Sequence, residues 1–174
     1  MYIPVILGTA REGRQSEKVA RFVRQEAVDF GLETEIIDVR DYRIEATNNT
    51  ENSTPAKKLA EKIGKAEGFI IVSPEYNHGY PGELKMMLDM LYRAYARKPV
   101  AFCGVSIGGL GGARCVEQLR LVSVEFHMVP IREAVYFSNV ANLFDANGGI
   151  QDPSYKERIK KMLNELSSYA KSLK

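Results

Sequence analysis

The stretch YIPVILGTAREGRQS, residues 2–16, passes from an apolar run into a loop of hydroxyl, glycine and arginine residues. The apolar part predicts a buried strand, and the amphipathic residues after position 16 predict a helix. Such a loop favours an anion, because the first N–H groups of a helix lack intrahelical partners and the helix dipole attracts negative charge. The spacing of Gly8 and Gly13 matches neither the P-loop nor the dinucleotide-binding pattern. We therefore interpret the loop as a phosphate site built from hydroxyl and guanidinium side chains; a plain strand–helix connection capped by Ser16 is the alternative.

The remaining sequence alternates between strand and helix patterns with short turns between them. Strands are expected at residues 2–8, 33–39, 68–73, 99–105 and 129–137, and helices at residues 17–30, from 54 onward, 81–95, 112–126 and 153–173. This alternation predicts an α/β fold with a doubly wound, five-stranded parallel sheet and helices on both faces. A polar loop at residues 43–53, rich in Asn and Thr, is expected to be mobile. We expect residues 1–174 to form a single domain.

Composition excludes several classes of function. The net charge of +2 is slight and the basic residues are scattered, which argues against nucleic acid as a binding partner. No apolar run reaches the roughly 18–20 residues of a membrane span, and we expect a cytoplasmic protein without a membrane partner. Cys103 and Cys115 form no metal-ligand or disulfide pattern, so both are predicted to be small buried side chains, and no metal is expected.

Two further loops follow predicted strands and carry unusual residues, at positions 74–82 and 106–112. In a doubly wound sheet the ligand lies outside the carboxyl ends of the strands, so these loops and loop 8–16 are expected to share one site. The first holds Tyr76 and Tyr80 for stacking and Asn77 for hydrogen bonding, while the glycines of the second allow close backbone approach. A phosphate at one end and a planar ring at the other describe a mononucleotide, and FMN fits best.

At this point the sequence resembles a known family. Gly8-Thr9-Ala10-Arg11 with Ser16, then SPEYNHGYPGELK at residues 73–85, then Gly108-Gly109-x-Gly-Gly are similar to the NADPH-dependent FMN reductases, a flavodoxin-like group with azoreductases, quinone reductases and chromate reductases. The resemblance covers nearly the whole chain. It implies a flavodoxin-like fold, non-covalent FMN, and NADPH or NADH as co-substrate. The resemblance further implies that the cofactor-binding residues are Thr9, Arg11, Gln15 and Ser16 at the phosphate, Pro74, Glu75, Tyr76 and Asn77 at the ring, and Ser106, Gly108 and Gly109 on the opposite wall.

The chemistry then belongs to the cofactor, and no catalytic side chain is expected. His78 is interpreted as a loop histidine that hydrogen-bonds a neighbour. Two residues depart from the family pattern, namely Arg14, where a small residue is common, and Met86, where asparagine is common. Arg14 is expected to contact phosphate or to reach the nicotinamide dinucleotide; together with Arg11 it favours NADPH over NADH.

The predicted helix at residues 81–95 carries Met86 and Met90 on a second apolar flank. This flank, like the resemblance, favours a homodimer or homotetramer; methionines that line the cleft or lie at the rim of the monomer core are the alternative. The predicted function is an NAD(P)H-dependent reductase of small-molecule acceptors, which include flavin, quinone and azo or nitro compounds. A flavodoxin-type electron carrier and a non-catalytic flavin sensor are the alternatives; the +2 charge disfavours the carrier, since such proteins are usually strongly acidic.

Overall fold

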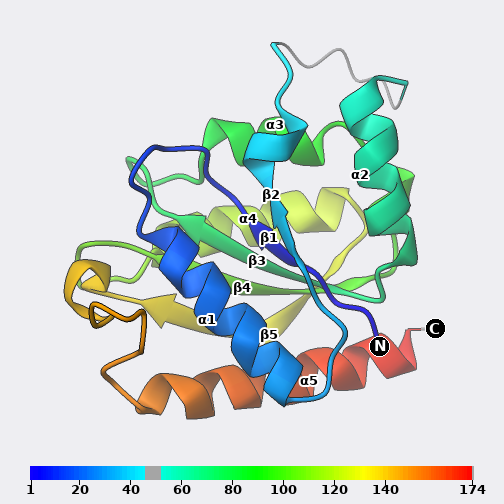
Figure 1. Cartoon of the computed structure of the whole chain (residues 1–174). Coiled ribbons are helices and arrows are strands. Elements are labelled where there is room, and N and C mark those ends of the chain that lie inside the picture. Colours follow the sequence, from blue (N-terminus) through cyan, green and yellow to red (C-terminus); the bar gives the residue numbers. More distant parts are fainter. Residues whose placement is uncertain (46–51, 174) are drawn as a thin grey trace.

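The computed structural model describes residues 1–45 and 52–173 (Figure 1). Within these residues five parallel strands form one sheet in the order β2-β1-β3-β4-β5. The strands are β1 (Val5–Leu7), β2 (Ile36–Asp38), β3 (Phe69–Pro74), β4 (Pro99–Val105) and β5 (Val129–Phe137). The helices are α1 (Ser16–Asp29), α2 (Thr54–Lys65), α3 (Gly82–Leu88), α4 (Ala113–Glu125) and α5 (Ser154–Ser172), with short 3-10 helices η1 (Val39–Tyr42), η2 (Arg93–Tyr95) and η3 (Val140–Asn142). This confirms the predicted doubly wound α/β fold; the strand order is that of flavodoxins.

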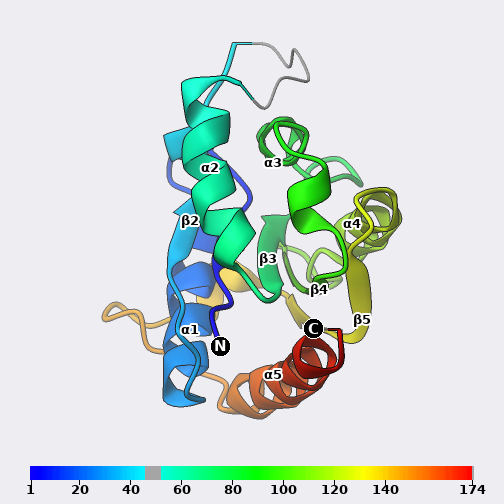
Figure 2. The ribbon, with the colours of Figure 1, turned by 90° about the vertical axis from the view of Figure 1, so that its right-hand side faces the viewer.

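Helices cover both faces of the sheet (Figures 1 and 2). Helices α1 and α5 pack on one face, and α2, α3 and α4 pack on the other. Side chains of a strand alternate between the faces, so Val5 and Leu7 join the first core while Ile6 joins the second. A strand buried on both faces needs a continuous apolar run, which explains the opening stretch of the sequence. No helix within the described residues is long and apolar enough to cross a membrane.

The predicted helix at residues 81–95 is wrong in its extent. Helix α3 ends at Leu88, and η2 follows after a turn. The break allows the Tyr95 ring to pack between Phe69 and Phe126, with ring centroids 5.8 Å and 5.2 Å away. Tyr95 is fully buried there, so packing of this ring accompanies the interruption of the helix.

The first two strands are shorter than predicted. Pro4 carries no N–H and interrupts the pairing, so Tyr2 and Glu33 form only an isolated bridge before β1 and β2 begin. Most of the predicted mobile loop at residues 43–53 lies outside the described residues, and its mobility stays a prediction. Cys103 and Cys115 are buried and unpaired, as predicted, and burial raises the pKa of the Cys115 thiol to about 11.

Candidate functional site

Three strand ends meet at one cavity of about 320 Å³. Strands β1, β3 and β4 end at neighbouring positions, because Leu7 pairs with Val72, and Pro74 pairs with Val105. The chain passes from β1 to β2 on one side and to β3 on the other, which makes this edge the topological switch point. The cavity is lined by Arg11, Glu12, Gly13, Arg14, Gln15, Ser16, Pro74, Glu75, Tyr76, Val105, Ser106, Ile107 and Val140.

The N-terminus of α1 forms one end of the cavity. Ser16 is the first residue of α1 and is only 2% exposed, yet its Oγ has no hydrogen-bond partner among the described residues. The side-chain oxygen of Gln15 is likewise buried without a partner, and Gln15 does not cap the helix through its side chain. Buried polar groups are normally satisfied, so the unpartnered Ser16 hydroxyl beside the N–H groups of a helix N-terminus indicates a place for a hydrogen-bonding anion, whereas the Gln15 oxygen needs a donor. Ser16 therefore is not a simple helix cap.

Arg11 and Arg14 have different roles. Arg11 is exposed at the cavity, and its guanidinium carbon lies 5.6 Å from the centre of the Tyr76 ring. The side chain of Arg14 is 4% exposed; its Nη1 donates to Asp38 Oδ1 at 2.8 Å, and its Nη2 pairs with the other carboxylate oxygen. Arg14 also donates to the Thr9 carbonyl oxygen and to Glu17. The Arg14 guanidinium ties the loop to the end of β2; Arg14 also lines the cavity, and its contact with a ligand phosphate stays a prediction.

The Arg14 pair also controls the ionisation of Asp38. Burial alone would raise the pKa of the Asp38 carboxyl, but hydrogen bonds from the Arg14 side chain and the Arg40 backbone outweigh it. Together with the charges of both arginines they hold that pKa below its ordinary value. Asp38 is thus a structural anion at the back of the loop.

Thr9 lies behind the cavity and does not line it. It is fully buried, and its Oγ1 lies 2.9 Å from the Tyr76 hydroxyl and 3.4 Å from Glu83 Oε1. The same Glu83 oxygen accepts a hydrogen bond from the Ala10 backbone N–H at 2.9 Å. Thr9 and Glu83 therefore connect loop 8–16 with the loop that follows β3.

The loop after β3 is a tight hairpin. Tyr76 and Gly79 exchange two backbone hydrogen bonds of 2.9 Å, and the two residues between them, Asn77 and His78, have φ values of 49° and 71°. Positive φ at both central residues is the pattern of a type I′ turn, for which asparagine is well suited. The turn places Tyr76 at the cavity and Asn77 outside its lining.

Helix α4 holds this hairpin in place. The side chain of Glu75 is buried, and Oε1 accepts from Arg114 Nε at 2.6 Å while Oε2 accepts from the Arg114 backbone N–H. Arg114 Nη1 also donates to His78 Nε2 at 2.8 Å, and Gln118 donates to the His78 carbonyl oxygen. The Glu75 carboxylate and the His78 ring thus have structural partners, in keeping with the absence of an expected catalytic side chain.

The glycines after β4 divide into two groups. A Cβ at Gly111 would meet Tyr136 Cβ at 2.7 Å, and one at Gly112 would meet the Val105 nitrogen at 2.6 Å, so these two glycines allow the loop to fold against the sheet. A Cβ at Gly108 or Gly109 would meet nothing within 4 Å. The second pair is open to solvent and lies outside the cavity lining.

The structure therefore brings together most, not all, of the predicted site. Seven predicted residues line the cavity, and they are Arg11, Gln15, Ser16, Pro74, Glu75, Tyr76 and Ser106; Thr9, Asn77, Gly108 and Gly109 do not. Val140 was missed, because the segment after β5 carries no chemical pattern. The Val140 backbone N–H donates to the Ser106 carbonyl oxygen, which holds this segment against the loop after β4. No group of three His, Cys, Asp or Glu residues suited to a metal occurs within residues 1–45 and 52–173.

Comparison with known proteins decides the family. The family model for NADPH-dependent FMN reductases matches residues 1–142. The chain belongs to this family. It is 34% identical over 131 residues to a quinone reductase of Escherichia coli K12, covering 71% of this chain and 70% of the relative. It is 33% identical over 133 residues to an NAD(P)H-dependent FMN reductase of Schizosaccharomyces pombe, covering 70% and 64%.

Among solved structures, the fold is similar to the flavoenzyme FerB, an NAD(P)H:(acceptor) oxidoreductase of Paracoccus denitrificans. The TM-score is 0.83 at 20% identity, covering 98% of this chain and 97% of the other. The fold is thus flavodoxin-like, and the family makes the chain an oxidoreductase with FMN as cofactor and NAD(P)H as co-substrate. The cavity fits that cofactor, because it offers unsatisfied polar atoms beside a helix N-terminus at one end and an aromatic side chain at the other.

In this FMN reductase, Glu83 is expected to position loop 8–16. An E83A variant removes the acceptor of the Ala10 N–H and a partner of Thr9, so the affinity for FMN should fall by about tenfold, the value of one or two hydrogen bonds. E83Q keeps an acceptor oxygen and should retain most of the affinity. Fluorescence titration of the FMN-free protein measures both.

Asp89 supplies the control for Glu83. Its carboxylate pairs with Lys85 and takes no part in loop 8–16, so D89A should leave FMN affinity unchanged. Equal losses in E83A and E83Q would contradict a positioning role through hydrogen bonding.

Proposed function

We propose that the enzyme passes electrons from NAD(P)H through FMN in the 320 Å³ cavity to a small planar acceptor, with quinones and free flavin first and azo or nitro compounds next. The observation that carries this proposal is the unpartnered Ser16 hydroxyl, buried in the cavity at the switch point of a chain of this family. Bound FMN would supply the chemistry, taking a hydride from the nicotinamide ring and returning two electrons to the acceptor.

The residues around the cavity have assigned parts in this proposal. Arg11, Gln15, Ser16 and the first N–H groups of α1 would hold the phosphate, with Thr9 supporting the loop from behind. Pro74, Glu75 and Tyr76 would form one wall at the ring and Ser106 the other. Asn77, Gly108 and Gly109 lie outside the cavity lining and are proposed to meet the ring where it extends past the cavity. The protein's task is to bind and orient the ring and to leave one face open for the two substrates.

Residues 1–174 are proposed to act as one domain, supported by the packing of α5 into the same core as α1 and the sheet. A cytoplasmic location is also proposed, since NAD(P)H is generated inside the cell.

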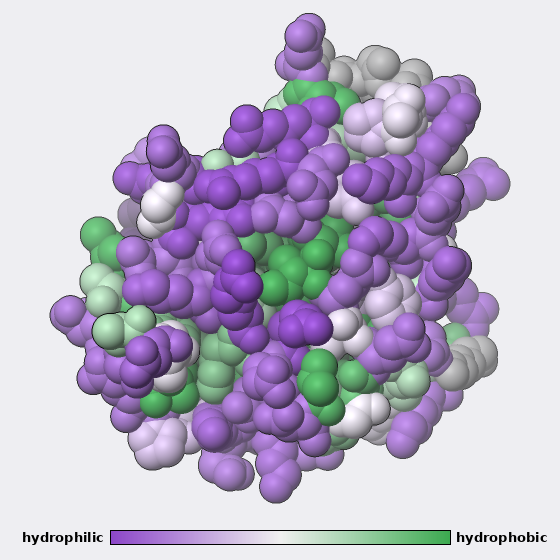
Figure 3. All heavy atoms as spheres, in the orientation of Figure 1, coloured by the Kyte–Doolittle hydropathy of each residue, from purple (hydrophilic) through white to green (hydrophobic). Residues whose placement is uncertain are grey.

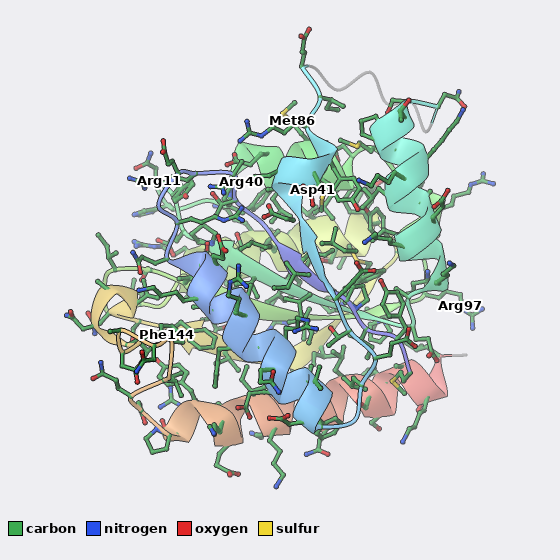
Figure 4. All side chains as sticks on the ribbon, viewed as in Figure 1. Arg11, Arg40, Asp41, Met86, Arg97 and Phe144 are labelled. Atoms are coloured by element: carbon green, nitrogen blue, oxygen red, sulfur yellow. The ribbon has the colours of Figure 1, made fainter. Side chains whose placement is uncertain are left out.

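A homodimer or homotetramer remains part of the proposal, but the observation that supports it is now on α4 rather than at the methionines of residues 81–95. Met90 is buried in the monomer core and Met86 is half-buried (Figure 4), whereas Leu121 and Val124 on α4 are 74% and 63% exposed. Large exposed apolar side chains on one helix favour a partner surface there.

An anaerobic absorbance spectrum tests the proposed reaction. FMN is added to the protein, and the oxidised flavin band is recorded before and after NADPH or NADH. We expect the band to disappear far faster than it does with free FMN. Bound flavin that stays oxidised with both coenzymes would contradict the reductase and favour the electron carrier or the sensor. Turnover with a quinone, free FMN, an azo dye and a nitroarene in parallel then ranks the acceptors.

A further inference from the structure

Three arginines gather on the outer side of loop 8–16, next to the end of β2. Arg40 lies in η1, and its Nη2 donates to the Arg11 carbonyl oxygen at 2.6 Å while its Nε donates to the Ala10 carbonyl oxygen at 3.2 Å. Arg43 Nη2 reaches the same Ala10 oxygen at 3.5 Å. Figure 4 shows Arg11 and Arg40 at the same edge of the molecule, and Figure 3 shows hydrophilic side chains over that edge. Loop 8–16 and η1 thus bring the guanidinium groups of Arg40 and Arg43 to the same backbone oxygen, next to Arg11 in the chain, and we call these three residues the arginine cluster.

The arginine cluster has no ion-pair partner in the part of the chain that the structure describes. Within residues 1–45 and 52–173, none of its members has a carboxylate within ion-pair distance, whereas Arg14 of the same loop is paired with Asp38 and Glu17. The Asp38 carboxylate is close enough to Arg40 to interact with its charge, but it forms its ion pair with Arg14. The partners of Arg40 are carbonyl oxygens, which fix its guanidinium without cancelling its charge. Two cations held at one backbone oxygen, with a third arginine next to it in the chain, create a local field that favours a multiply charged anion.

Arg40 is also presented for binding. Its bonds to the loop use Nε and Nη2, so one edge of the guanidinium is fixed and Nη1 on the other edge has no partner among the described residues. A guanidinium fork of this kind matches the oxygen atoms of a phosphate. Because the side chain is already ordered, little conformational entropy is lost when a ligand binds.

The arginine cluster lies largely outside the FMN cavity. Arg11 lines that cavity, but Arg40 and Arg43 do not. The arginine cluster therefore suits a phosphate other than that of FMN, and the reduced coenzyme carries such a phosphate. NADPH carries a 2′-phosphate on its adenosine, at the far end from the nicotinamide ring, so a site for this group belongs beyond the flavin cavity rather than inside it.

We infer that Arg40 and Arg43, with Arg11 between them and the cavity, form the site for the 2′-phosphate of NADPH and give the enzyme its preference over NADH. The part of the inference that concerns coenzyme preference during turnover rests on the proposed function. Arg14, together with Arg11, is expected from the sequence to favour NADPH, but the Arg14 guanidinium is hydrogen-bonded to Asp38. The inference assigns this role to Arg40 and Arg43, which contact the loop at the Ala10 carbonyl oxygen.

The double variant R40Q/R43Q tests the site by binding as well as by activity. Calorimetry on the FMN-loaded protein compares adenosine 2′,5′-bisphosphate with 5′-AMP, which lacks the 2′-phosphate. The wild type should bind the bisphosphate more tightly, and the variant should lose about tenfold or more of that affinity, as for one or two charge-assisted hydrogen bonds, while 5′-AMP binding stays constant. In turnover, kcat/KM should fall by the same factor for NADPH and not for NADH.

Arg97 provides a matched control. It is an exposed arginine at the opposite edge of the molecule (Figure 4), and R97Q should change neither ligand's affinity. R40K with Arg43 intact keeps the charge and should retain most of the preference.

Three results would overturn the inference. They are equal affinity of the wild type for the two adenosine nucleotides, no change in the double variant, and a loss of FMN affinity without change in the nucleotide preference. The last would assign the arginine cluster to the FMN phosphate. Failure of NADPH and NADH alike to reduce bound FMN would contradict the proposed function instead, and the calorimetric comparison would still decide the phosphate site.

Discussion

The S16D variant should bind FMN at least about a hundredfold more weakly than the wild type while remaining folded. Ser16 Oγ is buried in the cavity without a partner, so a carboxylate at this position would face the phosphate directly. Two like charges about 4 Å apart near a protein surface repel by about 4 kcal/mol, which exceeds the roughly 2.7 kcal/mol of a hundredfold change. Aspartate in the first turn suits the helix dipole, so α1 should keep its stability. FMN titration and thermal unfolding measure the two effects.

Riboflavin and S16A are the controls for this prediction. Riboflavin has the same ring without the phosphate, so its affinity should be the same in S16D and the wild type. S16A removes one hydroxyl without adding charge, and FMN affinity should fall only by about tenfold, the value of a hydrogen bond to a charged group. A parallel loss of riboflavin and FMN in S16D would show that Ser16 lies at the ring or supports the fold, and the phosphate assignment would be wrong.

The fold was predictable because its signals are local. Each strand that is buried on both faces is a continuous apolar run, as in residues 2–7 and 69–72, and the chain between strands carries helical periodicity. It could also be predicted that the loops after the strands lie together, because the carboxyl ends of parallel strands meet at the same edge of the sheet. The end of α3 could not be predicted, since nothing within residues 81–95 shows that Tyr95 fits between Phe69 and Phe126.

The site was predictable at the level of loops and less so at the level of side chains. Ser16 and Tyr76 reach the cavity because their positions in the loops place them there. Arg14 and Thr9 have the residue types of ligands, yet their partners are Asp38 and Glu83, which lie 24 and 74 residues away in sequence. Long-range partners decide whether a polar side chain is available to a ligand, and such partners cannot be identified from a single sequence.

The second large effect is expected at Arg14. Its buried guanidinium joins Asp38 to the Thr9 carbonyl oxygen, so R14L leaves a partly buried carboxylate without its cation. Breaking a buried pair in this way costs about 3–5 kcal/mol, and we expect R14L to lower the free energy of unfolding by about 3 kcal/mol. Urea denaturation at pH 7 measures the loss. R21L removes an exposed partner of Glu17 and should change stability by less than about 1 kcal/mol.

The pH dependence of this loss identifies its cause. Arg14 holds the pKa of folded Asp38 below its ordinary value of 3.8, so the pair stabilises the fold above that pH, and the contribution disappears as the pH falls through the folded-state pKa. The difference in unfolding free energy between the wild type and R14L should therefore be constant near neutral pH and shrink below about pH 4. R14L/D38L removes the stranded carboxylate and should recover part of the stability at pH 7, because replacing both members of a buried pair by apolar residues is often neutral. A loss that is independent of pH and unrelieved in the double variant would assign the role of Arg14 to its Thr9 contact and its packing, with the charge on Asp38 contributing little.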